Sequence, residues 1–164
     1  MDQMDSNTYN ADTYSYTTDL PTVMVELDTS LLSAPSHETK GAAGVDVRAA
    51  VQGTKTIMPN EKVMLNTGMR MAIPEGFFGM IVPRSGLATK HGLVLSNTVG
   101  IIDSDYRGEI MISMQNQSDT AHTIQTGDRV AQMILIPYLP FVVTEGSLTE
   151  TERNTGGFGS TGVK

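Results

Sequence analysis

From residue 23 onward, the chain consists of short segments with β-strand character separated by turn residues. Polar and apolar residues alternate, or short apolar runs end at Gly, Pro or Asn, at residues 23–27, 45–48, 62–65, 69–73, 77–82, 110–115 and 129–136. The almost wholly apolar run at 77–82 predicts a strand that is buried on both faces. Only residues 86–91 favour a helix, which Ser85 can cap and Gly92 can end. Many short strands with almost no helix predict an all-β sandwich, barrel or jelly roll.

The two ends of the chain differ from this central part. Residues 1–20 are polar, and we expect a disordered N-terminal extension there. One domain is expected over residues 21–144, with its last strand ending near residue 143, followed by a C-terminal arm over 145–164. Residues 153–162 contain four glycines, which are costly to order. The arm is therefore either a disordered tail or a segment that orders over a ligand, with Phe158 on a flat ring and Arg153 on phosphate.

Charge and composition exclude several classes of function. Lysine and arginine number 11 against 18 acidic residues, so the net charge is −7. This balance argues against a direct nucleic-acid or membrane-surface partner, because both need a basic face. The absence of cysteine rules out disulfides, thiolate metal sites and a cysteine nucleophile. The apolar runs are too short to span a bilayer and no signal-peptide pattern opens the chain, which predicts a cytoplasmic location.

Residues 83–88 occupy the transition from the 77–82 strand to the short helix. Amide groups at a helix start favour an anion, Ser85 adds a hydroxyl, and Arg84 supplies a charged fork that suits phosphate. By itself, the segment is explained more simply as an ordinary helix start with a surface arginine. Further along, Gln132 is a candidate donor to phosphate, whereas Asp128 and Arg129 are expected to pair with each other at a turn.

Residues 97–109 carry the densest group of candidate catalytic side chains. Two isoleucines lead into Asp103 and Asp105, which are followed by Tyr106. In strand-like geometry both carboxylates point to the same side. A carboxylate beside apolar residues can act as a general base toward water. A solvated hairpin tip is an equal alternative, because Asp and Gly favour turns.

The remaining polar and sulfur-containing residues suggest no further site. His37, His91 and His122 are scattered along the chain and indicate neither a metal cluster nor a catalytic triad. The 11 methionines are expected to serve mostly as adaptable core filler.

Five segments, taken together and in order, resemble the five motifs of the trimeric dUTP pyrophosphatases (dUTPases). They are residues 42–49, 83–88, 100–108, 127–134 and 153–162. Each motif is modest evidence by itself, but five in order at the family's spacing are specific, and the resemblance extends from about residue 21 to the end. Two features depart from the family pattern. Asn154 stands where glycine usually follows the arginine, and residues 1–20 have no counterpart.

The resemblance implies an all-β jelly roll of the dUTPase β-clip type with one short helix, assembled as a homotrimer with active sites shared between subunits. It implies hydrolysis of dUTP to dUMP and pyrophosphate with Mg²⁺, which limits uracil incorporation into DNA and supplies dUMP for dTMP synthesis. Asp103 is implied as the base that activates the water attacking the α-phosphorus. Asp46 is implied to lie near the water shell of the metal, without direct coordination.

The resemblance also implies the substrate contacts. Tyr106 would pack under the deoxyribose and exclude a 2′-hydroxyl, while Asn97, with the backbone that follows it toward Gly100, would read the uracil edge. Arg153 would reach the γ-phosphate and Phe158 would cover the uracil. The remaining implied binding residues hold phosphates or belong to the closing arm; they are Arg84, Ser85, Gly86, Gln132, Gly159 and Ser160.

Two other functions are compatible with the same fold. A dCTP deaminase would need a catalytic glutamate and a pocket for an exocyclic amine, and no segment matches these convincingly. A non-enzymatic regulatory trimer is the other alternative, against which the intact Asp103, Tyr106 and Arg153 argue.

Overall fold

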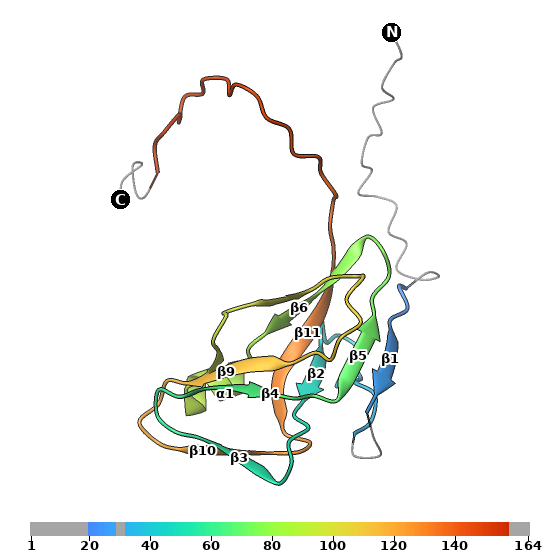
Figure 1. Cartoon of the computed structure of the whole chain (residues 1–164), viewed down its shortest axis with the longest axis vertical. Coiled ribbons are helices and arrows are strands. Elements are labelled where there is room, and N and C mark those ends of the chain that lie inside the picture. Colours follow the sequence, from blue (N-terminus) through green and yellow to red (C-terminus); the bar gives the residue numbers. More distant parts are fainter. Residues whose placement is uncertain (1–19, 29–31, 158–164) are drawn as a thin grey trace.

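The computed structural model describes residues 20–28 and 32–157, which contain eleven strands and one helix (Figure 1). The strands are β1 (Met24–Leu27), β2 (Val45–Arg48), β3 (Thr54–Ile57), β4 (Lys62–Leu65), β5 (Met69–Ala72), β6 (Phe77–Val82), β7 (Leu93–Leu95), β8 (Gly100–Ile102), β9 (Ile112–Asn116), β10 (His122–Gln125) and β11 (Arg129–Pro137). The helix is α1 (Ser85–His91). The prediction of an all-β fold with one short helix is confirmed.

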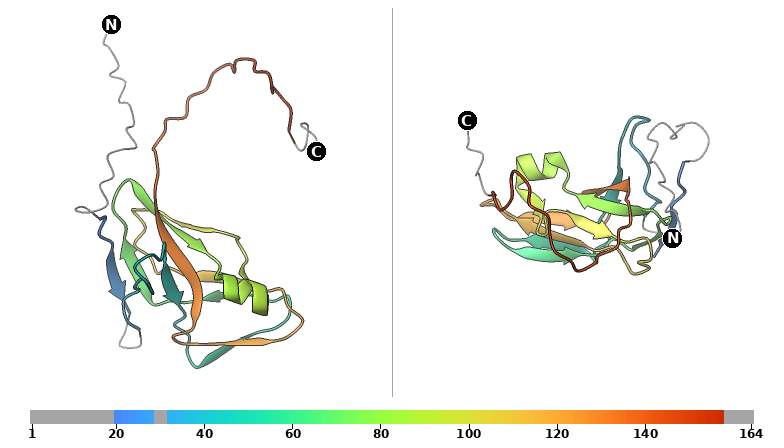
Figure 2. Two further views of the ribbon diagram at one scale, coloured as in Figure 1. Left: turned by 180° about the vertical axis from the view of Figure 1, so that it is seen from behind. Right: turned by 90° about the horizontal axis from the view of Figure 1, so that it is seen from above.

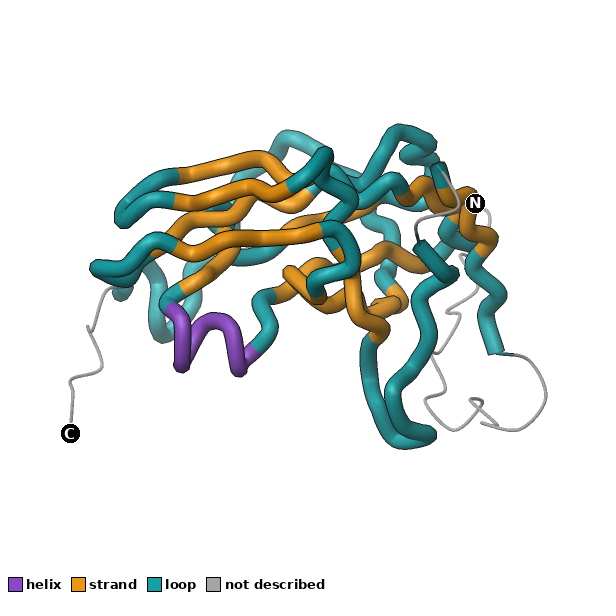
Figure 3. The backbone as a smooth tube through the Cα atoms, turned by 90° about the horizontal axis from the view of Figure 1, so that it is seen from below, coloured by secondary structure: helices purple, strands orange, loops and turns teal. Residues whose placement is uncertain are grey.

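The strands form four small antiparallel sheets. The largest has the order β2-β11-β6-β8, and a three-stranded sheet has the order β4-β9-β7. Two further pairs, β1-β5 and β10-β3, complete the set. Figure 3 shows α1 on the outside of the body formed by these strands. The described residues contain no helix that is long and apolar enough to cross a membrane.

The core lies between these sheets and is made of aliphatic side chains and methionine. Val47, Ile81 and Val130 contribute from the four-stranded sheet, and Leu65 and Ile112 contribute from the three-stranded one. Ile112 and Met114 are buried on one face of β9, as expected from strand alternation, and Ile110, which precedes the strand, is buried as well.

The methionines only partly follow the prediction that they fill the core. Met69, Met71, Met114 and Met133 are buried, whereas Met24, Met58, Met64 and Met111 are 45–68% exposed. The difference follows strand alternation, because the side chains of Met24 and Met64 lie on the outward faces of β1 and β4.

The sequence predictions were wrong for two elements around the helix. Strand β6 buries Gly79 and Ile81 but leaves Phe78, Met80 and Val82, on its other face, partly exposed, so in the single chain only one of its faces is covered. Ser85 is the first residue of α1 and does not cap it: the N-cap position belongs to Arg84, which makes no side-chain capping bond. Gly92 ends the helix as predicted, in the left-handed conformation that favours glycine.

The end of the last strand also differs from the prediction. Strand β11 ends at Pro137, and the last backbone bond to the body runs from the Tyr138 N–H to the Gly76 carbonyl, at 3.0 Å. Residues 138–150 contain no strand and are exposed. A strand needs a hydrogen-bonding neighbour, and none of the described strands lies beside this segment.

Asn116 is a buried polar residue that joins three segments of the fold. Its side-chain amide donates to the carbonyls of Ile57, at 3.0 Å, and Thr120, at 2.7 Å. Its Oδ1 accepts from the Ser118 N–H and hydroxyl, at 2.9 and 2.8 Å. All the side-chain hydrogen-bonding capacity is therefore satisfied in a residue that is 0% exposed.

Replacing Asn116 by alanine should destabilise the fold strongly. The change leaves the Ile57 carbonyl without its side-chain donor in the interior, and we expect a loss of about 2–4 kcal/mol in the free energy of unfolding. Denaturant titration measures this loss. The exposed neighbouring residue gives the matched control, Gln117→Ala, which should change stability by less than about 0.5 kcal/mol. Equal stability of the two variants would contradict the role assigned to Asn116.

Candidate active site

Strand pairing brings four of the predicted phosphate contacts to one place. In the register of the large sheet, Gln132 on β11 lies opposite Asp46 on β2 and opposite Val82 on β6. Val82 leads directly through Pro83 into Arg84 and the start of α1. As a result, one concavity of about 370 Å³ is lined by Arg84, Ser85, Gly86 and Gln132, together with Asp46. We call it the phosphate-side cavity.

An ionic cluster fixes the arginines of the phosphate-side cavity. Asp46 accepts from Arg84 Nε at 2.8 Å through Oδ1 and from Arg129 at 3.1 Å through Oδ2. Arg129 also lies 3.4 Å from the carboxylate of Glu38. The Asp46 side chain is 13% exposed, so its contacts with Arg84 and Arg129 are shielded from water and orient both guanidinium groups.

The partners of Arg129 differ from the predicted pair, and Gln132 makes a contact that was not predicted. Arg129 was expected to pair with Asp128, but its partners are Asp46 and Glu38. The Asp128 carboxylate accepts from the Gln125 N–H at 2.8 Å and so closes the turn before β11. Gln132 donates its side-chain amide to the Pro83 carbonyl at 3.0 Å, which holds the segment that leads into α1.

The chemistry of the donor set does not fit a metal held by protein side chains alone. Among the described residues, no group of three or more His, Asp or Glu side chains could hold an ion. Both oxygens of Asp46 already accept from arginines, and a cation would be repelled by those guanidinium groups. Direct coordination by Asp46 therefore does not fit, and its indirect role near a metal stays a prediction.

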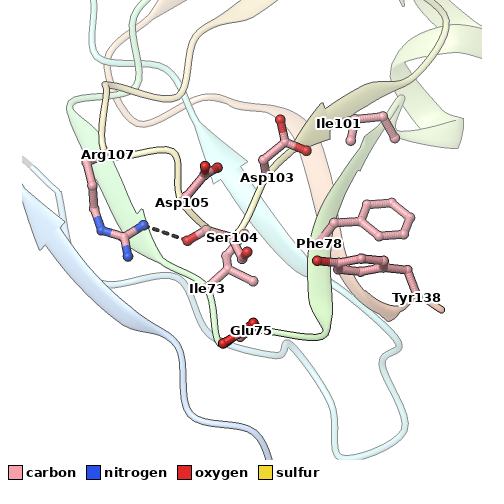
Figure 4. A pocket seen from close by; sticks show the side chains of 9 residues that line it. All are labelled: Ile73, Glu75, Phe78, Ile101, Asp103, Ser104, Asp105, Arg107 and Tyr138. Atoms are coloured by element: carbon pink, nitrogen blue, oxygen red, sulfur yellow. Dashed lines mark hydrogen bonds between the residues drawn. The ribbon is translucent and has the colours of Figure 1, made fainter. Parts of the chain in front are cut away.

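Asp103 lies in a second, larger concavity, the base-side cavity (Figure 4). This cavity has a volume of about 790 Å³, and its lining includes Asp103, Asp105, Ile101, Phe78 and Tyr138. Phe78 and Tyr138 form an aromatic pair with ring centroids 6.4 Å apart. A carboxylate is thus exposed beside apolar and aromatic walls.

The backbone around Asp103 differs from the predicted strand-like geometry. Strand β8 ends at Ile102, and the chain turns at residues 104–105. The Tyr106 N–H donates to the Asp103 carbonyl at 3.2 Å, and the Arg107 side chain donates to the carbonyls of Ser104 and Tyr106. The turn still allows Asp103 and Asp105 to line the same cavity.

Tyr106 lies in the loop after β8, and Asn97 lies in the turn between β7 and β8. The Tyr106 hydroxyl donates to the Glu109 carbonyl at 3.0 Å, and the residue is 45% exposed. A Cβ at Gly108 would collide with the Tyr106 hydroxyl, so any larger residue there would displace the tyrosine ring. Asn97 is exposed next to Gly100, where a Cβ would lie 3.6 Å from the Asn97 side-chain nitrogen.

The two cavities do not meet within one chain, since no described residue lines both. Arg153 makes only a local contact, from its Nε to the Gly156 carbonyl at 2.9 Å. Figures 1 and 2 show its segment leading away from the strands. Phe158, Gly159 and Ser160 lie outside the described residues. A single chain therefore presents separate parts of the predicted site.

Three contacts of the fold were missed by the sequence analysis. His91 and His122 were considered scattered, but their rings approach edge to face with centroids 5.5 Å apart. Arg129 joins the phosphate-side cavity. Glu109 binds a distant turn through its carboxylate. No local signal could have found the histidine pair or the Glu109 contact, because the partners lie 31 and 41–43 positions apart in the sequence.

Comparisons with known proteins agree with this geometry. The dUTPase family model matches residues 32–162. A deoxyuridine 5'-triphosphate nucleotidohydrolase of Rhizobium etli is 50% identical over 135 residues, covering 80% of this chain and 86% of that protein. A protein of the same name from Desulfotalea psychrophila is 50% identical over 139 residues, covering 83% and 91%.

Solved structures show the same fold. The dUTPase of Staphylococcus bacteriophage 80alpha with dUPNHPP has a TM-score of 0.78 and 28% identity, covering 87% of this chain and 99% of that one. A mutant dUTPase from phage phi11 of S. aureus, described with a coordinated structural Mg(II) ion, has a TM-score of 0.72 and 25% identity, covering 79% and 99%. With the family model matched over most of its length, and half of the aligned residues identical to two named relatives, this chain belongs to the dUTPase family.

Proposed function

We propose that this protein hydrolyses dUTP to dUMP and pyrophosphate. The observation that carries the proposal is the register of the large sheet, which gathers Arg84, Ser85, Gly86 and Gln132 in one concavity of a dUTPase family member. In the cell, this reaction keeps the dUTP concentration low and supplies dUMP for dTMP synthesis.

We also propose a cytoplasmic location, with no direct nucleic-acid or membrane partner.

Asp103 is the proposed general base. It removes a proton from water, whose oxygen attacks the α-phosphorus, and the bond from this phosphorus to the leaving pyrophosphate breaks. The exposed carboxylate beside Ile101 and Phe78 supports this role, because it can reach water within a partly apolar cavity. Positioning and charge stabilisation at phosphorus supply the rest of the rate.

The phosphate-side cavity is proposed to bind the triphosphate. Arg84 is already oriented by Asp46 at 2.8 Å, so little conformational freedom is lost when it contacts an anion. Ser85 and Gly86 add a hydroxyl and a side-chain-free approach to the backbone. Gln132, which holds the Pro83 carbonyl, would either keep that bond or exchange it for a phosphate oxygen.

Base selection and sugar selection are assigned to the two loops that flank β8. Asn97 and the backbone leading to Gly100 would read the uracil edge. The Tyr106 ring, held by its hydroxyl bond to the Glu109 carbonyl, would pack against the deoxyribose and leave no room for a 2′-hydroxyl. Steric exclusion of this kind needs a ring that does not move away.

A homotrimer with shared sites would join the two cavities. The separation of the two cavities within one chain supports this assembly. So does the arm, where Phe141, Val142 and Val143 are 82–92% exposed and lack a cover among the described residues. Arg153 and the segment through Phe158, Gly159 and Ser160 would then close over a neighbour's substrate.

Mg²⁺ is proposed to arrive with the substrate, held chiefly by triphosphate oxygens and water. The lack of a protein-only ligand group among the described residues supports this assignment. When bound, the ion would neutralise part of the triphosphate charge. Asp46 would then act through its two arginines and, at most, through the metal's water.

The proposed activity predicts a substrate profile and a catalytic variant. Purified protein should release pyrophosphate from dUTP much faster than from dTTP, dCTP or UTP. Asp103→Asn should lower this rate by about 10²–10⁴-fold, because it removes the general base, while a non-hydrolysable dUTP analogue still binds. The control Asp119→Asn changes an exposed carboxylate of the β9–β10 turn and should be neutral. Ammonia release from dCTP would instead indicate a deaminase.

Phosphate binding predicts a specific loss when Arg84 is changed. We expect Arg84→Gln to weaken binding of the analogue about tenfold or more, since a charged hydrogen bond is lost, and to leave deoxyuridine binding unchanged. Calorimetric titration measures both affinities. Arg48→Gln is the matched control, because Arg48 lies 3.9 Å from the carboxylate of Glu38, at the edge of the same ionic cluster, but does not line the phosphate-side cavity. Equal losses in both variants would count against Arg84 as a phosphate contact.

Shared sites predict that two inactive chains restore activity together. Asp103→Asn lacks the base, and a chain that stops after Glu152 lacks Arg153 and the end of the arm. Each should be nearly inactive alone. In co-refolded mixed trimers, some sites combine an intact Asp103 with an intact arm from another chain, and activity should return. Verified mixed trimers with no more activity than the separate variants would show that each arm serves its own chain.

A further inference from the structure

The carboxylate of Glu109 binds one distant turn through both of its oxygens. Oε1 accepts from the backbone N–H groups of Thr67 at 3.1 Å and Gly68 at 2.8 Å. Oε2 accepts from the Asn66 side-chain amide at 2.9 Å. These partners are 41–43 positions away in the sequence. Three hydrogen bonds to a carboxylate make a strong, directional contact.

The turn at residues 66–68 is itself fixed to the body of the protein. The Asn66 carbonyl accepts from the Ala50 N–H at 2.7 Å, and the Gly68 carbonyl accepts from the Asp28 N–H at 2.6 Å. Thr67 is 1% exposed, and its hydroxyl donates to the Ile110 carbonyl. Glu109 therefore binds a turn that is itself held by hydrogen bonds to residues 28, 50 and 110.

On its other side, Glu109 supports Tyr106. The Glu109 carbonyl accepts the Tyr106 hydroxyl at 3.0 Å. The tyrosine also lies so close to Gly108 that a Cβ there would collide with its hydroxyl. Tyr106 thus contacts the backbone of residues 108–109, which is held by the Glu109 carboxylate together with Ile110, whose N–H donates to the Met69 carbonyl at 2.8 Å.

The Glu109 side chain does not line the base-side cavity. It lines another concavity, with Asp28, Lys55 and Asn66, and contributes no group to the phosphate-side cavity. Any effect on the reaction must therefore pass through the residues that it holds.

We propose that Glu109 is a positioning residue that fixes the Tyr106 ring and thereby maintains discrimination between dUTP and UTP. This inference rests on the proposed function. Tyr106 is 45% exposed and has little packing of its own to hold it, so its hydroxyl bond and the underlying backbone set its position. Without the Glu109 carboxylate, the backbone of 108–109 relaxes and the ring yields to a 2′-hydroxyl.

The test compares the dUTP/UTP ratio of kcat/KM in three variants. Glu109→Ala removes all three side-chain bonds and should lower the ratio at least tenfold. Glu109→Gln can keep the two backbone bonds and, after rotation of the Asn66 amide, the third. It should stay within about threefold of the wild type. Glu61→Ala is the matched control, since the Glu61 carboxylate accepts from the Met58 N–H at 2.8 Å in a turn remote from the cavities.

The dUTP/UTP ratio of kcat/KM distinguishes a positioning role of Glu109 from a role in stability alone. Both alanine variants should melt at a lower temperature than the wild type, but only Glu109→Ala should change the substrate ratio. An unchanged ratio in folded Glu109→Ala overturns the inference and leaves the proposed function intact. A wild type without dUTP turnover overturns both. If Glu109→Ala does not fold, Asn66→Ala decides in its place: a fall of threefold or more supports the inference, and an unchanged ratio overturns it.

Discussion

The antiparallel pairing of β11 with β2 on one side and β6 on the other is the constraint on which the rest of the molecule depends. It places Gln132 opposite both Asp46 and Val82. A shift of one residue between β11 and β2 would place Asp46 and Gln132 on opposite faces of the sheet. The pairing is also sterically tight, because a Cβ at Gly44 would lie 2.7 Å from the Met133 carbonyl. Register and close approach thus position the phosphate-side cavity before any side chain contacts substrate.

Within the sheet formed by this pairing, Asp46 has a role that differs from metal coordination. It holds Arg84 and Arg129 at 2.8 and 3.1 Å. A partly buried carboxylate between two arginines fixes their direction and prevents mutual repulsion. On the opposite part of the site, Glu109 has the same kind of role for Tyr106. Both acids act by placing another residue, and neither of them lines the base-side cavity.

The division of the site into two cavities has a structural origin. Strand β8 lies at the edge of the large sheet next to β6, whereas Asp46 lies on β2 at the other edge. The two strands between them keep Asp103 and Asp46 on separate parts of the surface. Assembly of several chains would bring unlike cavities together, and the exposed apolar residues 141–143 give such an assembly a reason to form.

The sequence by itself determined the all-β class, the positions of most strands, and the segments that carry chemistry, because alternation, turn residues and motif spacing are local properties. It identified Arg84 and Gln132 as candidates but could not show that Asp46 holds Arg84, since partners 38 positions apart meet only through sheet register. The same limit applies to the pairing of Arg129 with Asp46, the contact of Glu109 with residues 66–68, and the outward face of β6. Tertiary structure decided these features, because hydrogen bonding between distant strands determines which local signals become neighbours.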